Sequence, residues 1–480
     1  MIQKAITKYG LAFHLAMLAA IPSSLVAFVS EQTLGGVVLW LSFFAFLWIF
    51  IEPSIRPGEH LSIARTRVCS SIVRDPVIWF LLLYAVLAAV RWLNSGMEMV
   101  YDPEKVAWRV SEPLMPIFPG SVGKVGFLPF TIAVGAVVLA AGLRHAIGLG
   151  ARSSFALSGS FIVGMGGFAS AVCSCVGMNP FATDALQGFG VVRSPSIGVL
   201  FAIWLLVGIG AGVLAEARKW RRGRLFYCIA IGGNVAGLLF FSSPLVAAAY
   251  SIVAFFFAVF CLIWLARVSS SGAMVRNLVF LTLGLLLPAF LVMSFSNPEF
   301  KKTKIDLLNP EKAWNPNVQN ADAILSDVSK RLWLAEPWLG TGLGAYKFKA
   351  PFVVRAEEWE VIPPKVERAV NGYWTLISER GNVMCGVMAL VISLMLFGWG
   401  SRCVKSYMSL RYDEDADAFL FACSPEVWVP LFFLPLLAVQ GRFESVYSVD
   451  TLFLALTALM ALAIASFPHR QKVEKLKEDN

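Results

Sequence analysis

The chain has 480 residues, of which 58% are hydrophobic and only 15% are charged, and its mean hydropathy is +0.70. Soluble domains are about half apolar and about one quarter charged, so this composition excludes an ordinary soluble enzyme and is typical of a protein with several membrane-spanning helices. The formal net charge of +9 does not indicate a nucleic-acid partner, because the basic residues follow membrane topology.

Long apolar segments recur along the whole chain. A helix that spans a membrane needs about 20 consecutive apolar residues, and twelve such segments are predicted, of which the eleventh is short. They are Tyr9–Phe28, Leu34–Ile51, Pro76–Trp92, Val125–Leu143, Ser154–Val176, Ser196–Leu214, Leu225–Phe241, Leu245–Ala266, Asn277–Phe295, Met384–Trp399, Val427–Val439 and Leu452–Phe467.

The Lys and Arg residues of the short connections predict the orientation. With the N-terminus in the cytoplasm, 22 of the 40 Lys and Arg residues fall in cytoplasmic segments, among them Arg144, Arg152 and Arg402. Six fall in short outer connections and 12 in one long polar stretch. We therefore expect a multi-pass membrane protein with both termini in the cytoplasm. The basic run Lys219–Arg224 is then a membrane-surface anchor rather than a nucleic-acid site.

The segments divide the chain into three parts. Residues 1–295 hold helices 1–9, residues 296–382 form a large periplasmic loop, and residues 383–480 hold helices 10–12 and a cytoplasmic tail. A second outer connection runs over Leu93–Lys124. The predicted fold is an all-α polytopic membrane protein with about 12 transmembrane helices and one large, partly helical periplasmic loop. Ionisable residues avoid the middle of the segments, which argues against an ion-coupled transporter.

The large loop has its own pattern. Asn320–Glu336 has apolar residues at helical spacing, and Pro337 ends this predicted helix. A glycine-rich run follows, Pro337-Trp338-Leu339-Gly340-Thr341-Gly342-Leu343-Gly344-Ala345-Tyr346. Such a run forms a tight turn or presents backbone N–H groups to an anion such as phosphate. A second helix is predicted over Val366–Arg380, running straight into the tenth segment.

This order of features resembles a known family. The glycine-rich run is followed, after an insert, by Ala369-Val370-Asn371-Gly372-Tyr373-Trp374-Thr375-Leu376-Ile377-Ser378-Glu379-Arg380-Gly381 and then by a membrane segment. It is similar to the O-antigen ligase and Wzy-type polymerase superfamily, which includes protein O-oligosaccharyltransferases. The resemblance implies a metal-independent, GT-C-like glycosyltransferase of the bacterial inner membrane without a cofactor. Its partners would be a lipid-linked oligosaccharide on an undecaprenyl diphosphate carrier, membrane lipid and other polysaccharide assembly proteins, with no nucleic acid.

The chain departs from the ligase pattern in two places. Ligases have a His where this chain has Val370, and all four of its histidines map to the cytoplasmic side. Where ligases tend to carry a Ser-Arg-Gly run, the chain reads Ser242-Ser243-Pro244. These departures favour a divergent polymerase or transferase that elongates or transfers lipid-linked glycan at the outer face. The alternatives are a transporter or flippase of lipid-linked saccharide and a catalytically silent scaffold of an assembly complex.

A diphosphate leaving group needs cations, and the arginine fork binds phosphate oxygens in pairs. Arg331 precedes Gly342 and Arg109 precedes Gly120 by the same arginine–ten–glycine spacing, which some Wzy polymerases share. The predicted catalytic residues are Arg331, Glu379, Arg368 and Arg193. Glu379 is the candidate acid/base or orienting carboxylate. The predicted substrate-binding residues are Arg109, Gly342, Gly344, Tyr346, Lys347, Asn371, Tyr373, Trp374 and Arg380.

Overall fold

The structure is a computed structural model of the chain. It describes residues 2–26, 29–55, 59–96, 99–102, 107–110, 115, 120–175, 197–217, 223–242, 244–268, 272, 275–279, 281–282, 284, 316–360, 372–411, 423–443 and 450–467.

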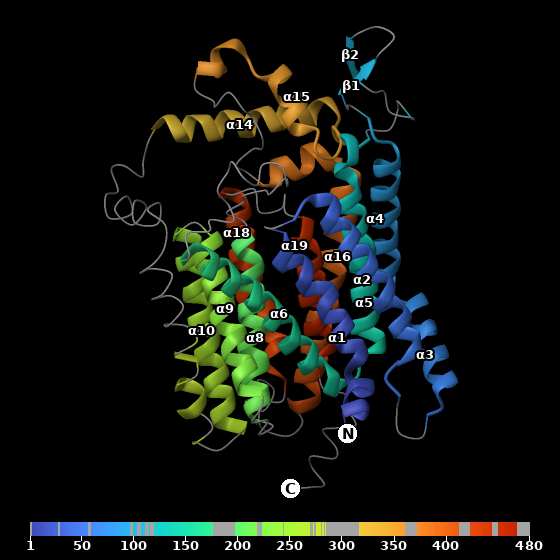
Figure 1. Cartoon of the computed structure of the whole chain (residues 1–480), viewed down its shortest axis with the longest axis vertical. Coiled ribbons are helices and arrows are strands. Elements are labelled where there is room, and N and C mark those ends of the chain that lie inside the picture. The colour runs from blue at the N-terminus through green and yellow to red at the C-terminus, as the bar shows by residue number, and fades with distance from the viewer. Residues whose placement is uncertain are drawn as a thin grey trace.

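Long helices packed side by side form the body of the molecule, which we call the bundle (Figure 1). The bundle helices are α1 (Ile2–Leu25), α2 (Glu31–Ile51), α4 (Pro76–Leu93), α5 (Phe127–Ala141), α6 (Leu149–Cys175), α8 (Gly198–Ala217), α9 (Gly223–Phe241), α10 (Pro244–Val268), α16 (Gly372–Arg411), α18 (Val429–Phe443) and α19 (Asp450–Ala465). Each predicted apolar segment except the ninth coincides with one of them. The ninth, Asn277–Phe295, lies mostly outside the described residues.

Shorter elements connect and cover these helices. They are α3 (Leu61–Val73), η1 (Gly123–Gly126), the π-helical turn η2 (Gly142–Ala146), α14 (Pro316–Ala335), α15 (Tyr346–Val353), η5 (Ala356–Glu360) and η6 (Pro425–Trp428). Local sequence explains two of the helix starts. The side chain of Ser30 accepts the N–H of Thr33 at the start of α2, and Asp75 caps α4, which has Pro76 in its first turn. Both are typical N-terminal signals.

Five of the described helices are long and apolar enough to cross a membrane: Glu31–Ile51, Pro76–Leu93, Phe127–Ala146, Val246–Val268 and Gly372–Met408. Large apolar side chains also lie exposed on the outside of the bundle, including Trp40, Phe255, Phe256 and Phe397. Water disfavours so much exposed apolar surface, whereas lipid accommodates it. The chain is therefore a largely helical membrane protein.

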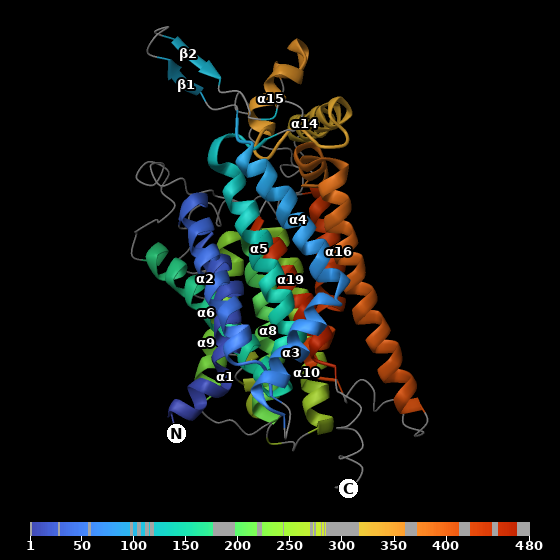
Figure 2. The same ribbon diagram turned by 90° about the vertical axis from the view of Figure 1, so that its right-hand side faces the viewer.

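Two groups of neighbouring helices can be distinguished in the bundle. One group contains α6, α8, α9 and α10, and the other contains α1, α2, α4 and α5. Helix α1 packs extensively against α6 and joins the two groups, and α19 also joins them by packing against α5, α16, α1 and α8. Figure 2 shows α4, α5 and α16 side by side, with α16 extending along the bundle. One continuous apolar core runs through all of these helices.

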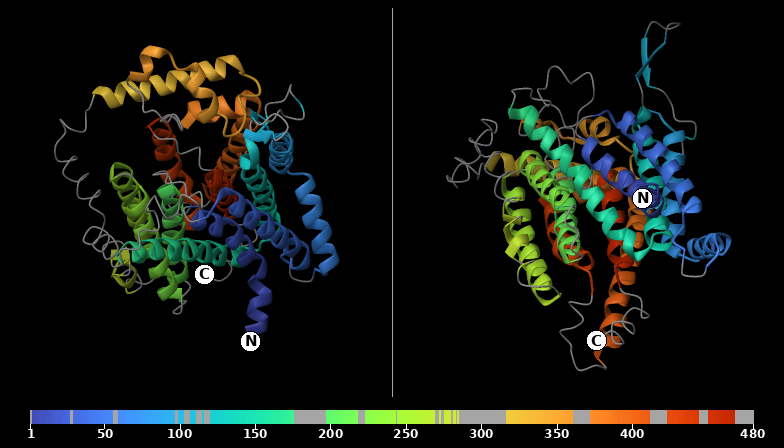
Figure 3. Two further views of the ribbon diagram at one scale, coloured as in Figure 1. Left: turned by 45° about the horizontal axis from the view of Figure 1, so that its top comes forward. Right: turned by 60° about the horizontal axis from the view of Figure 1, so that its bottom comes forward.

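The described part of the large loop lies across one end of the bundle, which we call the loop end. Figures 1 and 3 show α14 and α15 crossing that end, while α1 begins at the opposite end. A two-stranded antiparallel hairpin, β1 (Met99–Asp102) and β2 (Ala107–Val110), lies at the loop end too (Figure 1). The described parts of the second connection, Leu93–Lys124, and of the large loop thus lie at the same end.

Two details differ from the sequence prediction. The hairpin is an addition to the all-α expectation, and it forms where the chain is rich in strand-favouring residues such as Tyr101 and Trp108, which pair in its register. The helix before the tenth segment does not run straight into it. Gly381 has φ 68° and ψ 174° and breaks α16 there. The predicted helix Asn320–Glu336 is confirmed as α14, and the loop has a small core of its own.

Candidate functional site

The glycine-rich run fits against the break in α16. Thr341 donates its N–H to the Ser378 carbonyl at 2.8 Å, and Gly342 donates to the Glu379 carbonyl at 3.2 Å. On the other side of the break, Asn382 donates to the Pro337 carbonyl at 2.9 Å. A Cβ atom on Gly381 would lie 2.3 Å from the Leu339 carbonyl carbon, so only glycine permits this backbone contact. The run and the break form one interlocked backbone structure.

Arg91, at the end of α4, holds this structure to the bundle. Its guanidinium donates to the carbonyls of Glu379 at 3.1 Å and Arg380 at 2.9 Å, and also to the carbonyl of Leu339. The residue is 4% exposed. Arg91 therefore donates to carbonyls of both α16 and the glycine-rich run, and it supplies donors to buried acceptors where these two segments meet. We call Arg91, Leu339–Tyr346 and Glu379–Gly381 the junction.

The second connection also reaches the junction. The carbonyl of Leu343 accepts the N–H of Val122 at 3.1 Å. A Cβ atom on Gly342 would lie 2.3 Å from the Gly120 carbonyl oxygen, and one on Gly344 would lie 2.9 Å from a methyl carbon of Val125. The two glycines singled out by the arginine–ten–glycine spacing, Gly120 and Gly342, thus lie in contact. This contact accounts for glycine at position 342, and a Cβ atom on Gly120 would lie 1.7 Å from the Asn94 carbonyl oxygen, so backbone packing explains both glycines without a ligand.

Glu379 lies at the junction with a half-buried side chain. Its carboxylate accepts the backbone N–H of Tyr346 at 3.2 Å. Tyr346 itself is 1% exposed, and its hydroxyl donates to the Leu325 carbonyl at 3.1 Å. Burial raises the pKa of Tyr346 to about 12. The hydrogen bond with Ser329 lowers this pKa and the nearby charge of Glu379 raises it, but burial has the largest effect. Tyr346 therefore stays protonated and acts within the loop core, whereas Glu379 is the acidic side chain of the junction.

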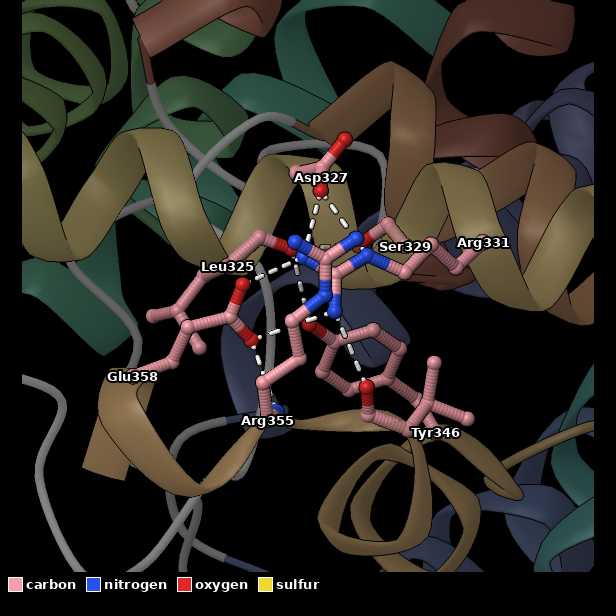
Figure 4. A network of polar contacts seen from close by, with 8 residues as sticks. Leu325, Asp327, Ser329, Arg331, Tyr346, Arg355 and Glu358 are labelled. Carbon is pink, nitrogen blue, oxygen red and sulfur yellow. Dashed lines mark hydrogen bonds and ion pairs between the residues drawn. The ribbon is translucent and has the colours of Figure 1, made fainter.

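Arg331 binds within the loop (Figure 4). Its guanidinium pairs with Asp327 at 2.5 Å and with Glu358, and it donates to the Val353 carbonyl at 3.0 Å. The hydrogen bond between Arg331 and Glu358 raises the pKa of Arg331 and lowers that of Glu358. Arg331 thus connects α14 to α15 and η5, which favours a structural role over the predicted catalytic one.

Arg380 points into the bundle below the junction. It is 6% exposed, pairs with Asp450 at the start of α19, and donates to the Tyr84 hydroxyl. Its predicted substrate-binding role would require breaking this buried pair, which is costly. The contacts connect α16, α19 and α4 directly beneath the residues that Arg91 holds.

Two aromatic residues at the start of α16 lie near the loop. The rings of Trp374 and Trp333 lie 6.0 Å apart, and Trp333 donates to the Asn382 side chain at 3.0 Å. This pair packs α14 against α16. Tyr373 is exposed, and its hydroxyl donates to the Ala438 carbonyl on α18 at 2.8 Å. Of the two, Tyr373 offers more surface to a ligand.

The structure does not describe the side chains of five predicted site residues. Arg193, Arg368 and Asn371 fall outside the described residues, and only the backbone is described for Arg109 in β2 and Lys347 in α15. The structure brings together Glu379, Gly342, Gly344, Tyr346 and Arg380, and it places Arg331 in a separate network.

Sequence reasoning missed the role of Arg91, although this residue and Asp450 stand out as charges at the ends of apolar segments. Among the described residues, no group of three or more His, Cys, Asp or Glu side chains is arranged to hold a metal ion. Comparison of the sequence with models of known protein families and with curated proteins found no match.

Proposed function

We propose that this chain is a membrane glycosyltransferase that transfers or polymerises glycan from an undecaprenyl diphosphate carrier at the outer face of the inner membrane. In this proposal the membrane part has 12 spans, the loop end faces the periplasm, and the junction is the working site. The observation that carries the proposal is the position of Glu379, whose carboxylate lies where the large loop meets the bundle. The resemblance of its sequence surroundings to the ligase and polymerase superfamily supports the same reaction class.

The reaction needs a group that accepts a proton from the acceptor hydroxyl, and a half-buried carboxylate suits that step. Glu379 is held by the Tyr346 N–H, so its orientation is defined before a substrate binds. Tyr373, exposed six residues earlier, would contact the sugar. The site lies at the ends of membrane-crossing helices, where a lipid-linked donor would present its head group.

The departing diphosphate needs positive charge. Arg91, Arg331 and Arg380 already bind carbonyls or carboxylates, so they are poor candidates for this task. The proposal therefore assigns the diphosphate to Arg193 and Arg368, the two predicted catalytic arginines outside the described residues. Neither Arg91 nor Arg380 needs to leave its partners in this scheme.

The experiment is gene deletion followed by complementation. Deletion should shorten or remove a cell-surface polysaccharide, and the wild-type gene should restore it. Glu379→Gln, which keeps size but removes the charge, should reduce glycan elongation about 100-fold or more, as loss of a general base does. Glu358→Gln is the matched control, because it makes the same change in the same loop away from the junction. Both variants must reach wild-type levels in the membrane fraction.

Two results would overturn the proposal. Unchanged polysaccharide after deletion would show that the chain does not catalyse glycan transfer or polymerisation. Full restoration of the polysaccharide by Glu379→Gln would show that Glu379 is not the general base. A direct assay adds a second line of evidence. Purified protein in detergent, given undecaprenyl diphosphate-linked repeat units, should lengthen or transfer the glycan without any partner protein.

Because Arg91, Arg331 and Arg380 already bind groups of the protein itself, a second candidate function is a catalytically silent scaffold of a polysaccharide assembly complex. A scaffold predicts that deletion affects the glycan while Glu379→Gln and Arg368→Ala both restore it. The purified chain would then leave lipid-linked glycan unchanged. The transferase predicts the reverse in both measurements.

A further inference from the structure

The opposite end of the bundle, where α1 begins, also buries arginines. Arg144 lies in η2, Arg152 near the start of α6, and Arg402 near the end of α16. Arg402 interacts electrostatically with both of the others. Three separate elements therefore bring three guanidinium groups into one region, which we call the arginine cluster.

The contacts of the arginine cluster are incomplete. The Nε atom of Arg144 pairs with Asp75 at 2.9 Å, and one Nη atom of Arg402 donates to the Ile464 carbonyl at 2.5 Å. Arg152 is 8% exposed, yet its Nε and one Nη atom have no hydrogen-bond partner among the described residues. One Nη atom of Arg144 likewise has no hydrogen-bond partner among the described residues.

Such an arrangement is unfavourable without a ligand. Buried N–H donors that lack acceptors lose the hydrogen bonds that water would supply, and like charges repel in a poorly solvated region. Among the described residues, two carboxylates face the cluster. Asp75 pairs with Arg144 at 2.9 Å and contacts His145 at 2.7 Å. Glu426 interacts electrostatically with Arg152, and its carboxylate accepts the Ser424 hydroxyl at 3.0 Å. These two negative charges of the described residues do not balance three arginines, so an anion would complete the cluster.

The chemistry of guanidinium indicates which anion fits. Its planar N–H groups bind the oxygens of a phosphate in pairs. The cluster also lies at the ends of membrane-crossing helices, the depth of lipid head groups, and basic sites between helices on the cytoplasmic side bind anionic lipids. We propose that Arg144, Arg152 and Arg402 form a binding site for a phosphate group, supplied by an anionic phospholipid or by free phosphate. This site is separate from the junction and does not depend on the proposed transfer reaction.

The test uses the purified full-length chain in a neutral detergent with its lipid removed. Thermal unfolding is followed with added phosphatidylglycerol, with phosphatidylcholine as the uncharged control lipid, and with inorganic phosphate. Wild-type protein should unfold several degrees higher with phosphatidylglycerol or phosphate than with phosphatidylcholine. The apparent affinity should fall at least tenfold in Arg152→Gln.

A second variant, Arg144→Lys, keeps the test valid if Arg152→Gln does not fold. Arg144→Lys can keep the charge opposite Asp75 but loses the unpartnered Nη atom, so it should also weaken binding. Arg67→Gln is the control, because Arg67 lies in α3 at the same end and is paired with Glu59 at 2.9 Å. It should leave binding unchanged.

The outcomes separate the sources of the phosphate. Stabilisation by phosphatidylglycerol alone identifies a lipid head group, and equal stabilisation by inorganic phosphate identifies a soluble anion. Stabilisation by neither, or stabilisation that persists in both Arg152→Gln and Arg144→Lys, would overturn the proposal and leave ordered water as the occupant of the cluster.

Discussion

Two ends of one bundle bury arginine in different ways. At the loop end, Arg91 and Arg380 donate to carbonyls, to a hydroxyl and to the Asp450 carboxylate. At the opposite end, Arg152 is buried almost as deeply as Arg91, yet two of its nitrogen atoms have no hydrogen-bond partner among the described residues. Burial of an arginine therefore does not by itself reveal its role, and the partners of its N–H groups decide between support of the fold and binding of a ligand.

The largest effect is expected for Arg91→Met. The change keeps an apolar side chain of similar length but removes the donors to the carbonyls of Leu339, Glu379 and Arg380. Loss of donors to several buried acceptors should lower the free energy of unfolding by about 3–5 kcal/mol. Denaturant unfolding in detergent measures it. The control is Arg65→Met, since Arg65 is exposed and donates to one carbonyl. Equal stability of the two variants would contradict the role given to Arg91.

The next effect tests the break in α16. Gly381→Ala places a Cβ at φ 68°, against the backbone of Leu339, and should cost about 2–4 kcal/mol. The matched control is Gly386→Ala in the same helix, where a Cβ meets nothing within 4 Å. That change should be neutral or add up to about 1 kcal/mol. If Gly381→Ala behaves like Gly386→Ala in the same unfolding measurement, the interlocked backbone of the junction is wrong.

A smaller effect is expected inside the loop. The hydrogen bond from Arg331 holds the pKa of Glu358 below its ordinary value of 4.5. The pair therefore contributes stability above pH 4.5 and loses it as the pH falls through the lowered pKa of the folded state. At pH 7, Glu358→Gln should cost about 1 kcal/mol or less because the pair is partly exposed. Loop proteolysis across pH 3–7 would show the difference between variant and wild type vanishing in acid. A difference that grows in acid would reverse the sign and contradict this assignment.

The smallest effect belongs to the arginine cluster. Without lipid or phosphate, Arg152→Met removes a buried charge whose Nε and one Nη atom have no partner. Its stability should stay within about 1 kcal/mol of wild type, because few contacts are lost. Thermal unfolding in lipid-free detergent provides the comparison with Arg91→Met. A loss as large as that of Arg91→Met would show that Arg152 already has protein partners and would remove the contrast between the two ends.

The sequence predicted the helices of the bundle and α14 because both rest on hydrophobic periodicity, which is local in the chain. The partners of Arg91 could not be predicted, since they are backbone carbonyls from residues far along the chain, and no side-chain pattern marks a carbonyl. Arg331 shows an intermediate case. Its pairing with Asp327 follows helical i,i+4 spacing, but Glu358 comes from another element.

The glycine-rich run shows that one sequence pattern is compatible with two structural roles. Glycines can expose N–H groups to a phosphate or allow two backbones to touch. Here the N–H groups of Thr341 and Gly342 donate to carbonyls of α16. Only the fold distinguishes these outcomes, because the sequence spacing is the same in both. The two glycines of the arginine–ten–glycine spacing likewise reflect backbone contacts: Gly342 lies against the Gly120 carbonyl, and Gly120 lies against the Asn94 carbonyl.

Both proposals rest on one claim, that the loop end faces the periplasm and the opposite end faces the cytoplasm. Labelling of single cysteines with a membrane-impermeant maleimide tests it most directly. Phe352→Cys, at a position 90% exposed in α15, is made in a chain without other cysteines, and its partner variant retains only the exposed Cys69 of α3. The account predicts that Phe352→Cys is labelled in intact cells and that Cys69 is labelled only after the membrane is permeabilised. Labelling of Cys69 in intact cells, with Phe352→Cys protected until permeabilisation, would contradict it.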